Sequence, residues 1–268
     1  MLERNIALHE LMVKVVGLRF PAVALKIIED EAEVPEGAIS PLKDWGKHIA
    51  ICQAFAFARR EGKIIYMKKE DHWCWNPILT YGIIDKEVGR AGFHAMHKAM
   101  GRDTASGDAF VDSFPYLPYG KTKGILIAPL NKADFEPDVT MIYCKNDQLR
   151  LFLMGLDTQR PELLESSFKA IDSCTYAVIP AILNGNYRIT LPDPGEYERA
   201  LTPEDDIILS VPAPKIEQFT NALNAQLKFG ARDHFFPIMK EDFPRPSIYN
   251  ILFEAWGLDL GDDENKTI

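Results

Sequence analysis

The cysteines are the residues of this chain whose type and placement could support chemistry. Four are spread along 268 residues, Cys52, Cys74, Cys144 and Cys174. Cys74 and Cys174 each follow polar residues able to cap a helix, which predicts that both stand at a helix start. Unpaired N–H groups at a helix start stabilise a thiolate over a thiol. Because the thiolate is the form that binds a metal or attacks a substrate, we expect the function to lie at the cysteines.

Several kinds of cysteine site are open from the residues alone. The close C-x-x-C pairs typical of iron–sulfur and zinc sites are absent, so metal ligands would have to converge through the tertiary structure. Zinc would suit Cys52, Cys74 and Cys174 with His72 or a water, since an extended segment puts His72 about 6–7 Å from Cys74 on the same face. Cys144 ends an apolar strand and is a reserve ligand. Buried thiols and a thiol nucleophile are the metal-free alternatives.

A second group of candidates lies at a turn, Asn184-Gly185-Asn186-Tyr187-Arg188. Arg188 leaves this turn as a candidate clamp for a carboxylate or phosphate, with Asn184 beside it as a second substrate-binding residue. The turn follows the predicted Cys174 helix by one helix length. Arg188 would therefore reach Cys174 only if its strand runs back beside the helix. The chain has no phosphate-binding loop, dinucleotide fingerprint or serine-hydrolase elbow.

The elements that must position these residues alternate between helices and strands without regular βαβ units. This pattern predicts an α/β or α+β fold with a mixed β-sheet flanked by helices. Residues 22–82 and 139–183 show a similar order of strand, helix and helix-start cysteine, which suggests two similar lobes. Helices are expected at 6–18, 47–60, 93–100, 106–113, 147–154, 174–183 and 214–228, and strands at 22–28, 63–67, 124–130, 139–144, 187–191 and 206–212.

Domain organisation follows from the same pattern. We expect a single body at 1–231, with lobes at about 1–135 and 136–231, and a C-terminal arm at 232–268. The arm is rich in proline and aromatic residues, which suggests a homodimer.

Amino-acid composition limits the class of protein and the cellular compartment that we expect. Hydrophobic residues make up 47% and charged residues 26%, as in ordinary globular proteins, and the net charge is −9. This acidic balance argues against nucleic-acid binding. No apolar run approaches the ~20 residues of a membrane span, and the N-terminus lacks signal-peptide features. We therefore expect a cytoplasmic protein whose thiols are reduced.

A set of ordered motifs resembles one known family. The motifs are Phe20-Pro21-Ala22-Val23-Ala24-Leu25-Lys26, Cys52-Gln53-Ala54 with Ala58-Arg59 and Gly62, the Cys74 segment, and Ser173-Cys174 leading to Asn184-Gly185-Asn186-Tyr187-Arg188. Over roughly residues 15–228 the chain resembles the prokaryotic domain-of-unknown-function family 169 (DUF169), common in anaerobes and archaea. The resemblance implies a cytoplasmic protein with three recurrent cysteines, matched here by Cys52, Cys74 and Cys174.

The resemblance favours one hypothesis over the others. The leading expectation is an iron–sulfur protein, an oxidoreductase or a lyase, with Cys52, Cys74 and Cys174 holding a [4Fe–4S] cluster beside a small-molecule pocket. One iron would stay open for redox or Lewis-acid chemistry on a small organic acid. The alternative is a non-catalytic ligand-binding or accessory module with structural zinc or buried thiols.

Overall fold

The computed structural model describes residues 1–159, 164–229 and 247–257. The chain divides into two compact units, Met1–Ala231 and Arg232–Ile268. The second unit covers the expected C-terminal arm, and its described part is α12 (Ser247–Ala255) with the two residues that follow. The rest of the arm lies outside the described residues. Its role in a homodimer stays a prediction.

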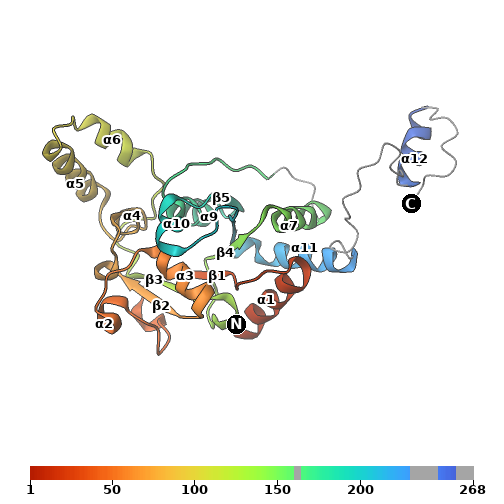
Figure 1. Cartoon of the computed structure of the whole chain (residues 1–268), viewed down its shortest axis with the longest axis horizontal. Helices are drawn as coiled ribbons and strands as arrows, with labels where there is room; N and C mark the ends of the chain where they lie inside the picture. Colours follow the sequence, from red (N-terminus) through yellow and green to blue (C-terminus); the bar gives the residue numbers. More distant parts are fainter. Residues whose placement is uncertain (160–163, 230–246, 258–268) are drawn as a thin grey trace. The chain divides into compact units, whose positions relative to one another are not determined.

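A six-stranded sheet forms the centre of the first unit, in the order β2-β3-β1-β4-β6-β5 (Figure 1). Each of its ladders is antiparallel. The central strands β1 and β4 meet over a short register, from Val23 opposite Met141 to Leu25 opposite Val139. The strands are β1 (Val23–Ile28), β2 (Ile65–Lys68), β3 (Gly124–Pro129), β4 (Val139–Cys144), β5 (Arg188–Thr190) and β6 (Ile207–Pro212).

The expected combination of a sheet with flanking helices is confirmed, and the pairing directions refine it. The sheet is antiparallel rather than mixed, and parallel pairing within the described residues is confined to two isolated bridges, Ile39 with Ile65 and Ile49 with His72. Runs of apolar residues predict where the strands lie along the chain. They do not show whether paired strands run parallel or antiparallel, because that depends on the segments that connect the strands.

The two halves of the sheet have equivalent orders. β1, β2 and β3 come from residues before 135, and β4, β5 and β6 from residues after 136. In the first half, the third strand (β3) lies between the first (β1) and the second (β2). In the second half, the third strand (β6) lies in the same way between the first (β4) and the second (β5). The halves therefore meet at β1 and β4, and each places a strand of three or four residues at an edge.

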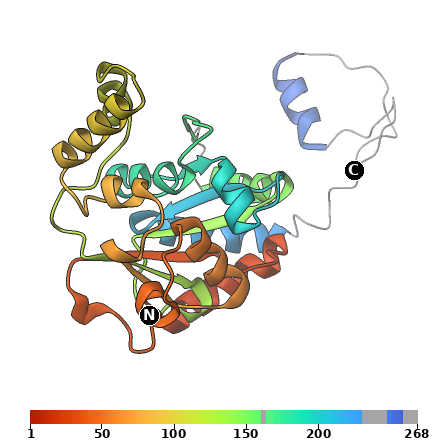
Figure 2. The same cartoon turned by 60° about the vertical axis from the view of Figure 1, so that its left-hand side comes forward.

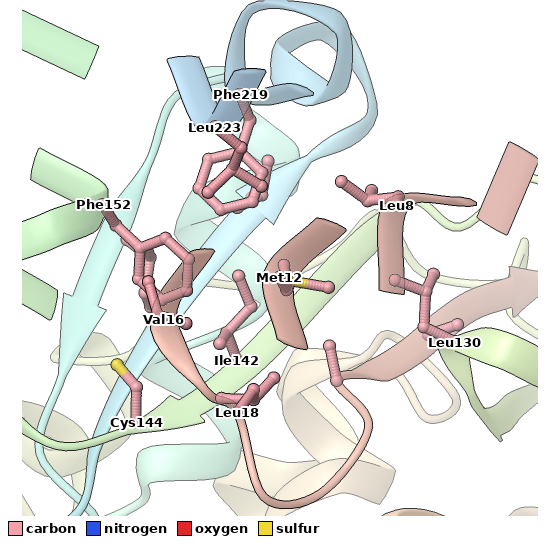
Figure 3. Packing of buried hydrophobic residues seen from close by; sticks show 14 of the residues in the cluster. Leu8, Met12, Val16, Leu18, Leu130, Ile142, Cys144, Phe152, Phe219 and Leu223 are labelled. Carbon is pink, nitrogen blue, oxygen red and sulfur yellow. The ribbon is translucent and has the colours of Figure 1, made fainter. Parts of the chain in front are cut away.

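One face of the sheet is covered by three long helices, α1 (Leu2–Val16), α7 (Asn146–Gln159) and α11 (Ile216–Phe229). Met12 of α1 and Phe152 of α7 are buried in this layer, as Figure 3 shows for the cluster around them. α1 ends at Gly17, which adopts the left-handed conformation (φ 66°) that favours glycine.

The opposite face carries shorter helices. Alternation along the strands separates the two layers: Val23 and Leu25 of β1 face the short helices, while Ala24 between them faces the long ones. α10 packs mainly on α3. The helices of this layer are α3 (Ile51–Glu61), α4 (Trp75–Thr80), α8 (Ser173–Tyr176), α9 (Ile179–Asn184) and α10 (Pro194–Ala200), with α2 (Pro41–Trp45) beside β2.

The single helix expected at 174–183 is in fact two, α8 and α9. Pro180 lacks a backbone N–H, and in a continuous helix its ring would clash with the carbonyl four residues earlier, that of Tyr176. α8 therefore ends at Tyr176, and a new helix begins after Val178 (φ −105°, ψ −58°) with the proline near its N-terminus.

A helical hairpin of α5 (Lys86–Ala99) and α6 (Ala105–Asp112) stands away from the sheet (Figure 2). Arg90 joins its two helices, donating to Asp108 at 2.8 Å and to Asp112 at 2.8 Å. An aromatic cluster links the hairpin to the body, since Trp75 of α4 lies 4.9 Å from Phe93 and 5.9 Å from Phe110 between ring centroids.

Candidate functional site

Cys52, Cys74 and Cys174 all stand at the N-terminal ends of helices on one face of the sheet. Cys52 is the second residue of α3, Cys74 is the N-cap of α4 in extended geometry (φ −104°, ψ 138°), and Cys174 is the second residue of α8. The expectation of helix-start cysteines is confirmed for Cys74 and Cys174. Cys52 and Cys174 are buried and Cys74 is half-buried.

The fold brings together segments that lie far apart in the chain, so that Cys52 and Cys74 both add to the rise in the pKa of Cys174 that burial causes. The Cys52 thiol points to the Gly195 carbonyl at 3.6 Å, and the Cys174 thiol points to the Asn76 side-chain oxygen at 3.7 Å. Two of the three cysteines come from the first half of the chain and one from the second.

Asn76 holds the Cys74 and Cys174 helices together. Its side chain is 1% exposed, its amide donates to Asp172 at 2.9 Å, and its oxygen accepts from Thr175. Thr80 joins the same network through the Thr175 hydroxyl at 2.9 Å. Because buried amide and hydroxyl groups have little freedom once paired, this network fixes the spacing of Cys74 and Cys174.

α10 adds a positive charge to the site. Arg199 folds back along its own helix so that its guanidinium lies against Gly195, and its positive charge acts on Cys52. It also stacks on Trp73, with Cζ 5.1 Å from the ring centroid. Trp73 directly precedes Cys74, so the guanidinium bridges the segments that carry two of the cysteines.

Behind the cysteines lies a buried acidic group, Glu196. Its carboxylate, 0% exposed, accepts hydrogen bonds from the Tyr143 hydroxyl at 2.8 Å and the Thr202 hydroxyl at 2.9 Å. Arg59 lies beyond these, donating to Thr202 at 2.8 Å and placing its guanidinium 3.8 Å from the Tyr143 ring centroid. Burial raises the pKa of Glu196 to about 7, although these hydrogen bonds and Arg59 oppose the shift.

The cysteine pKa values contradict the expectation of thiolates. Burial raises the pKa of Cys52 to about 12, raises that of Cys74 despite a hydrogen bond from the Asn76 backbone, and raises that of Cys174 well above its usual value. Loss of solvation outweighs the partial charge at a helix end. All three are thiols at neutral pH, so a low-pKa thiol nucleophile has no support here. Any metal must displace their protons.

The two reserve ligands are placed differently. Cys144 lies in the layer of long helices, on the opposite face of the sheet from the other cysteines (Figure 3). His72 is 7% exposed, neither ring nitrogen has a hydrogen-bond partner among the described residues, and burial lowers its pKa to about 4. Over residues 1–159, 164–229 and 247–257, no group of three or more His, Cys, Asp or Glu side chains is arranged to hold a metal ion.

Arg188 and Asn184, the predicted substrate-binding pair, are engaged elsewhere or exposed. The Arg188 guanidinium donates to the Ser167 carbonyl at 2.6 Å and the Ser167 hydroxyl at 2.7 Å. Asn184 is exposed at the C-terminal end of α9. Arg188 therefore anchors the segment before α8, whereas the charge of Arg199 acts on Cys52.

Arg199 and Glu196 were missed from the sequence because α10 was not expected. The signal for this helix was present: Asp193 caps it by accepting from the Glu196 N–H at 3.0 Å, Pro194 follows, and Glu196 occupies the third helical position. An N-cap acid, a proline and a glutamate at this spacing would have identified the helix start.

An open apolar groove of about 320 Å³ adjoins the site between α4 and α5. Trp75, which follows Cys74, forms one wall together with Ile78, and Val88, Phe93 and Met96 form the other. The groove has the size and apolar lining of a small-molecule site.

Comparison with known proteins places the chain in a family without assigning an activity. The model of the DUF169 family, described as uncharacterised ArCR proteins, matches residues 11–222, so the chain belongs to this family. An uncharacterised protein of Methanocaldococcus jannaschii is 21% identical over 206 residues, covering 76% of this chain and 86% of that protein. No solved structure matches the chain. Within the described part of the chain, no helix is both long and apolar enough to cross a membrane.

Proposed function

We propose that this protein is a cytoplasmic iron–sulfur protein in which Cys52, Cys74 and Cys174 hold a [4Fe–4S] cluster. The observation that supports it is the placement of three cysteines at three separate helix starts, with Cys52 and Cys74 both acting electrostatically on Cys174. When bound, such a cluster supplies an open iron for electron transfer or Lewis-acid chemistry. The ligand class we propose is a small organic acid.

The residues present fit such a group in two respects. Thiolate sulfur is the usual donor to iron–sulfur clusters, and Cys74 is accessible enough for a cluster to be inserted. Arg199 supplies a positive charge beside the Cys52 sulfur, which offsets part of the cost of ionising buried thiols.

The chain's own residues have clear tasks in this proposal. Asn76 keeps the Cys74 and Cys174 helices at a fixed spacing, and the Tyr81 hydroxyl donates to the Cys174 carbonyl at 2.8 Å to hold the start of α8. The apolar groove beside Trp75 would receive the apolar part of a ligand. A non-catalytic module with zinc or buried thiols is the second candidate, and the unpartnered nitrogens of buried His72 favour it.

The test is iron, acid-labile sulfide and zinc analysis with a visible spectrum on protein purified without oxygen. About four irons and four sulfides per chain, with broad absorption near ~400 nm, are expected for a [4Fe–4S] cluster. Cys52→Ala, Cys74→Ala and Cys174→Ala should each lose the absorption. Cys144→Ala is the matched control, because Cys144 is equally buried but lies across the sheet.

Two outcomes would contradict the proposal. Never-oxidised protein without iron and sulfide would reject it, and stoichiometric zinc would select the second candidate. Loss of iron in Cys144→Ala to the same extent as in the other variants would show that the assigned ligands are wrong.

A further inference from the structure

The two halves of the fold carry their helix-start residues at equivalent positions. In the first half, Cys52 is the second residue of α3, which lies between β1 and β2, and Cys74 is the N-cap of α4, the first α-helix after β2. In the second half, Cys174 is the second residue of α8, which lies between β4 and β5. The first helix after β5 is α10, and its N-cap is Asp193. Asp193 is therefore the counterpart of Cys74.

The contacts between the halves repeat this equivalence. The Cys52 sulfur lies 3.6 Å from the carbonyl oxygen of Gly195, the second residue of α10. The Cys174 sulfur lies 3.7 Å from the side-chain oxygen of Asn76, the second residue of α4. α3 packs on α10 in the same way as α8 packs on α4. Each buried cysteine thus reaches across to the same position of the helix that the other half supplies.

The two N-cap residues also share their local structure. Cys74 has φ −104° and ψ 138°, and Asp193 has φ −93° and ψ 172°, so both are extended. Both are half-buried, and both precede an exposed first helical residue and a buried second one. Three of the four equivalent positions are cysteines, and the fourth is an aspartate.

The Asp193 carboxylate lies among the segments that carry the cysteines. It accepts from the Ser173 N–H, directly before Cys174, at 2.9 Å and from the Glu196 N–H at 3.0 Å. Its charge acts on each of the three cysteines. A carboxylate has about four lone-pair sites, so two hydrogen bonds leave it able to take a further partner.

We propose that Asp193 is the fourth protein ligand of the cluster, bound through a carboxylate oxygen to the iron that the three cysteines leave without a thiolate. This inference rests on the proposed function, because it completes the same site. Since thiolate is the preferred donor to iron–sulfur clusters, the Asp193 bond is the weakest of the four. It is therefore the bond that the carboxylate of a small organic acid can replace.

The test is made on the full-length protein purified without oxygen, with bipyridine as a competing iron chelator and with the reduction potential as a second readout. Asp193→Asn should release its iron at a chelator concentration at least about tenfold lower than the parent does, since even the partners of metal ligands contribute this much. It should fold, because asparagine caps a helix as well as aspartate does.

Asp193→Cys places a thiol at the position equivalent to Cys74, which itself makes no side-chain capping hydrogen bond. This variant should hold iron at least as tightly as the parent. Its reduction potential should be lower, because clusters held by cysteine alone have lower potentials than clusters with mixed ligands. A residue that only caps α10 would not change the potential.

The matched control is Asp85, which is also half-buried and caps α5 by accepting from the Glu87 N–H at 2.8 Å. Asp85→Asn and Asp85→Cys make the same changes on the helical hairpin and should leave the iron content and the potential unchanged. An equal release of iron in Asp85→Asn would overturn the inference, because loss of stability would then explain the effect.

The remaining outcomes separate this inference from the proposed function. Iron-containing parent and Asp193 variants with the same chelator dependence and the same potential would overturn the assignment of Asp193 and leave the cluster in place. Parent protein without iron and sulfide would overturn the proposed function and the assignment with it. If Asp193→Asn does not fold, the potential of Asp193→Cys decides.

Discussion

Glu196 provides a sharp test of the site's electrostatics. Its carboxyl is fully buried, and its pKa is about 7 in the folded protein because burial disfavours the charged form. In the unfolded chain the same group titrates near 4.5. Between these values the unfolded chain binds fewer protons than the folded one, so the free energy of unfolding decreases as the pH rises. The full contribution is present below about pH 4.5 and is lost by about pH 7.

The magnitude follows from the two pKa values. One pKa unit corresponds to about 1.4 kcal/mol, so ionising Glu196 should lower the free energy of unfolding by about 2–3 kcal/mol between pH 5 and pH 8. Glu196→Gln cannot ionise. Its free energy of unfolding relative to that of the parent should therefore rise by about 2–3 kcal/mol from pH 5 to pH 8. A cost of the amide that does not depend on pH shifts the whole curve and leaves this rise unchanged.

Urea unfolding at pH 5, 6, 7 and 8, under constant ionic strength and reducing conditions, measures this difference. Other titrating groups, among them His72 and Asp172, are common to both proteins and cancel. Glu198→Gln is the control, since it removes a carboxyl from the same helix that is 73% exposed. Stability curves of Glu196→Gln and the parent that run parallel from pH 5 to pH 8 would refute the reasoning.

Further predictions concern packing and the spacing of the cysteines. Gly155→Ala should destabilise the protein by about 1–3 kcal/mol, because its Cβ would lie 2.9 Å from the Ala222 carbonyl where α7 and α11 meet. Gly92→Ala, with no atom within 4 Å of the new Cβ, should instead stabilise it by about 0.5–1 kcal/mol, and thermal unfolding of the two variants measures both. Asn76→Ala should lower the free energy of unfolding in urea by about 2–3 kcal/mol, because it leaves buried partners unpaired. It should also reduce the iron content, because the Cys74 helix is no longer held to Asp172. Unchanged iron content would show that this network does not set the cysteine spacing.

The sequence predicts those parts of the fold that local patterns specify. The apolar runs at 124–130 and 139–144 lie in central strands buried on both faces, which is why composition alone located them. Gly62 ends α3 as expected, because it adopts the left-handed conformation that stops a helix. Strand direction was not predictable, since it depends on how distant segments pair.

In the candidate site, too, local sequence predicts some features and the tertiary structure determines the others. Helix-start cysteines could be recognised from their neighbours, but their protonation could not, because burial is a property of the folded molecule. The sequence alone does not distinguish Arg188 from Arg199 as a candidate site residue. Only the tertiary structure shows that one is bound to Ser167 and that the charge of the other acts on Cys52.

The strand order also determines when the site can form as the chain is made. β1 has no neighbouring strand near it in sequence, since Val23 pairs with Pro129 on one side and Met141 on the other. Of the strands that pair within the described residues, β5 and β6 lie nearest in sequence and the other pairs join distant segments, so most pairing is non-local and we expect slow folding. During synthesis, Cys52 and Cys74 emerge before β4 and the Cys174 helix have been made. For the proposed cluster, this order means that the three cysteines are present together only late in synthesis, and we therefore expect any loading to follow release of the finished chain.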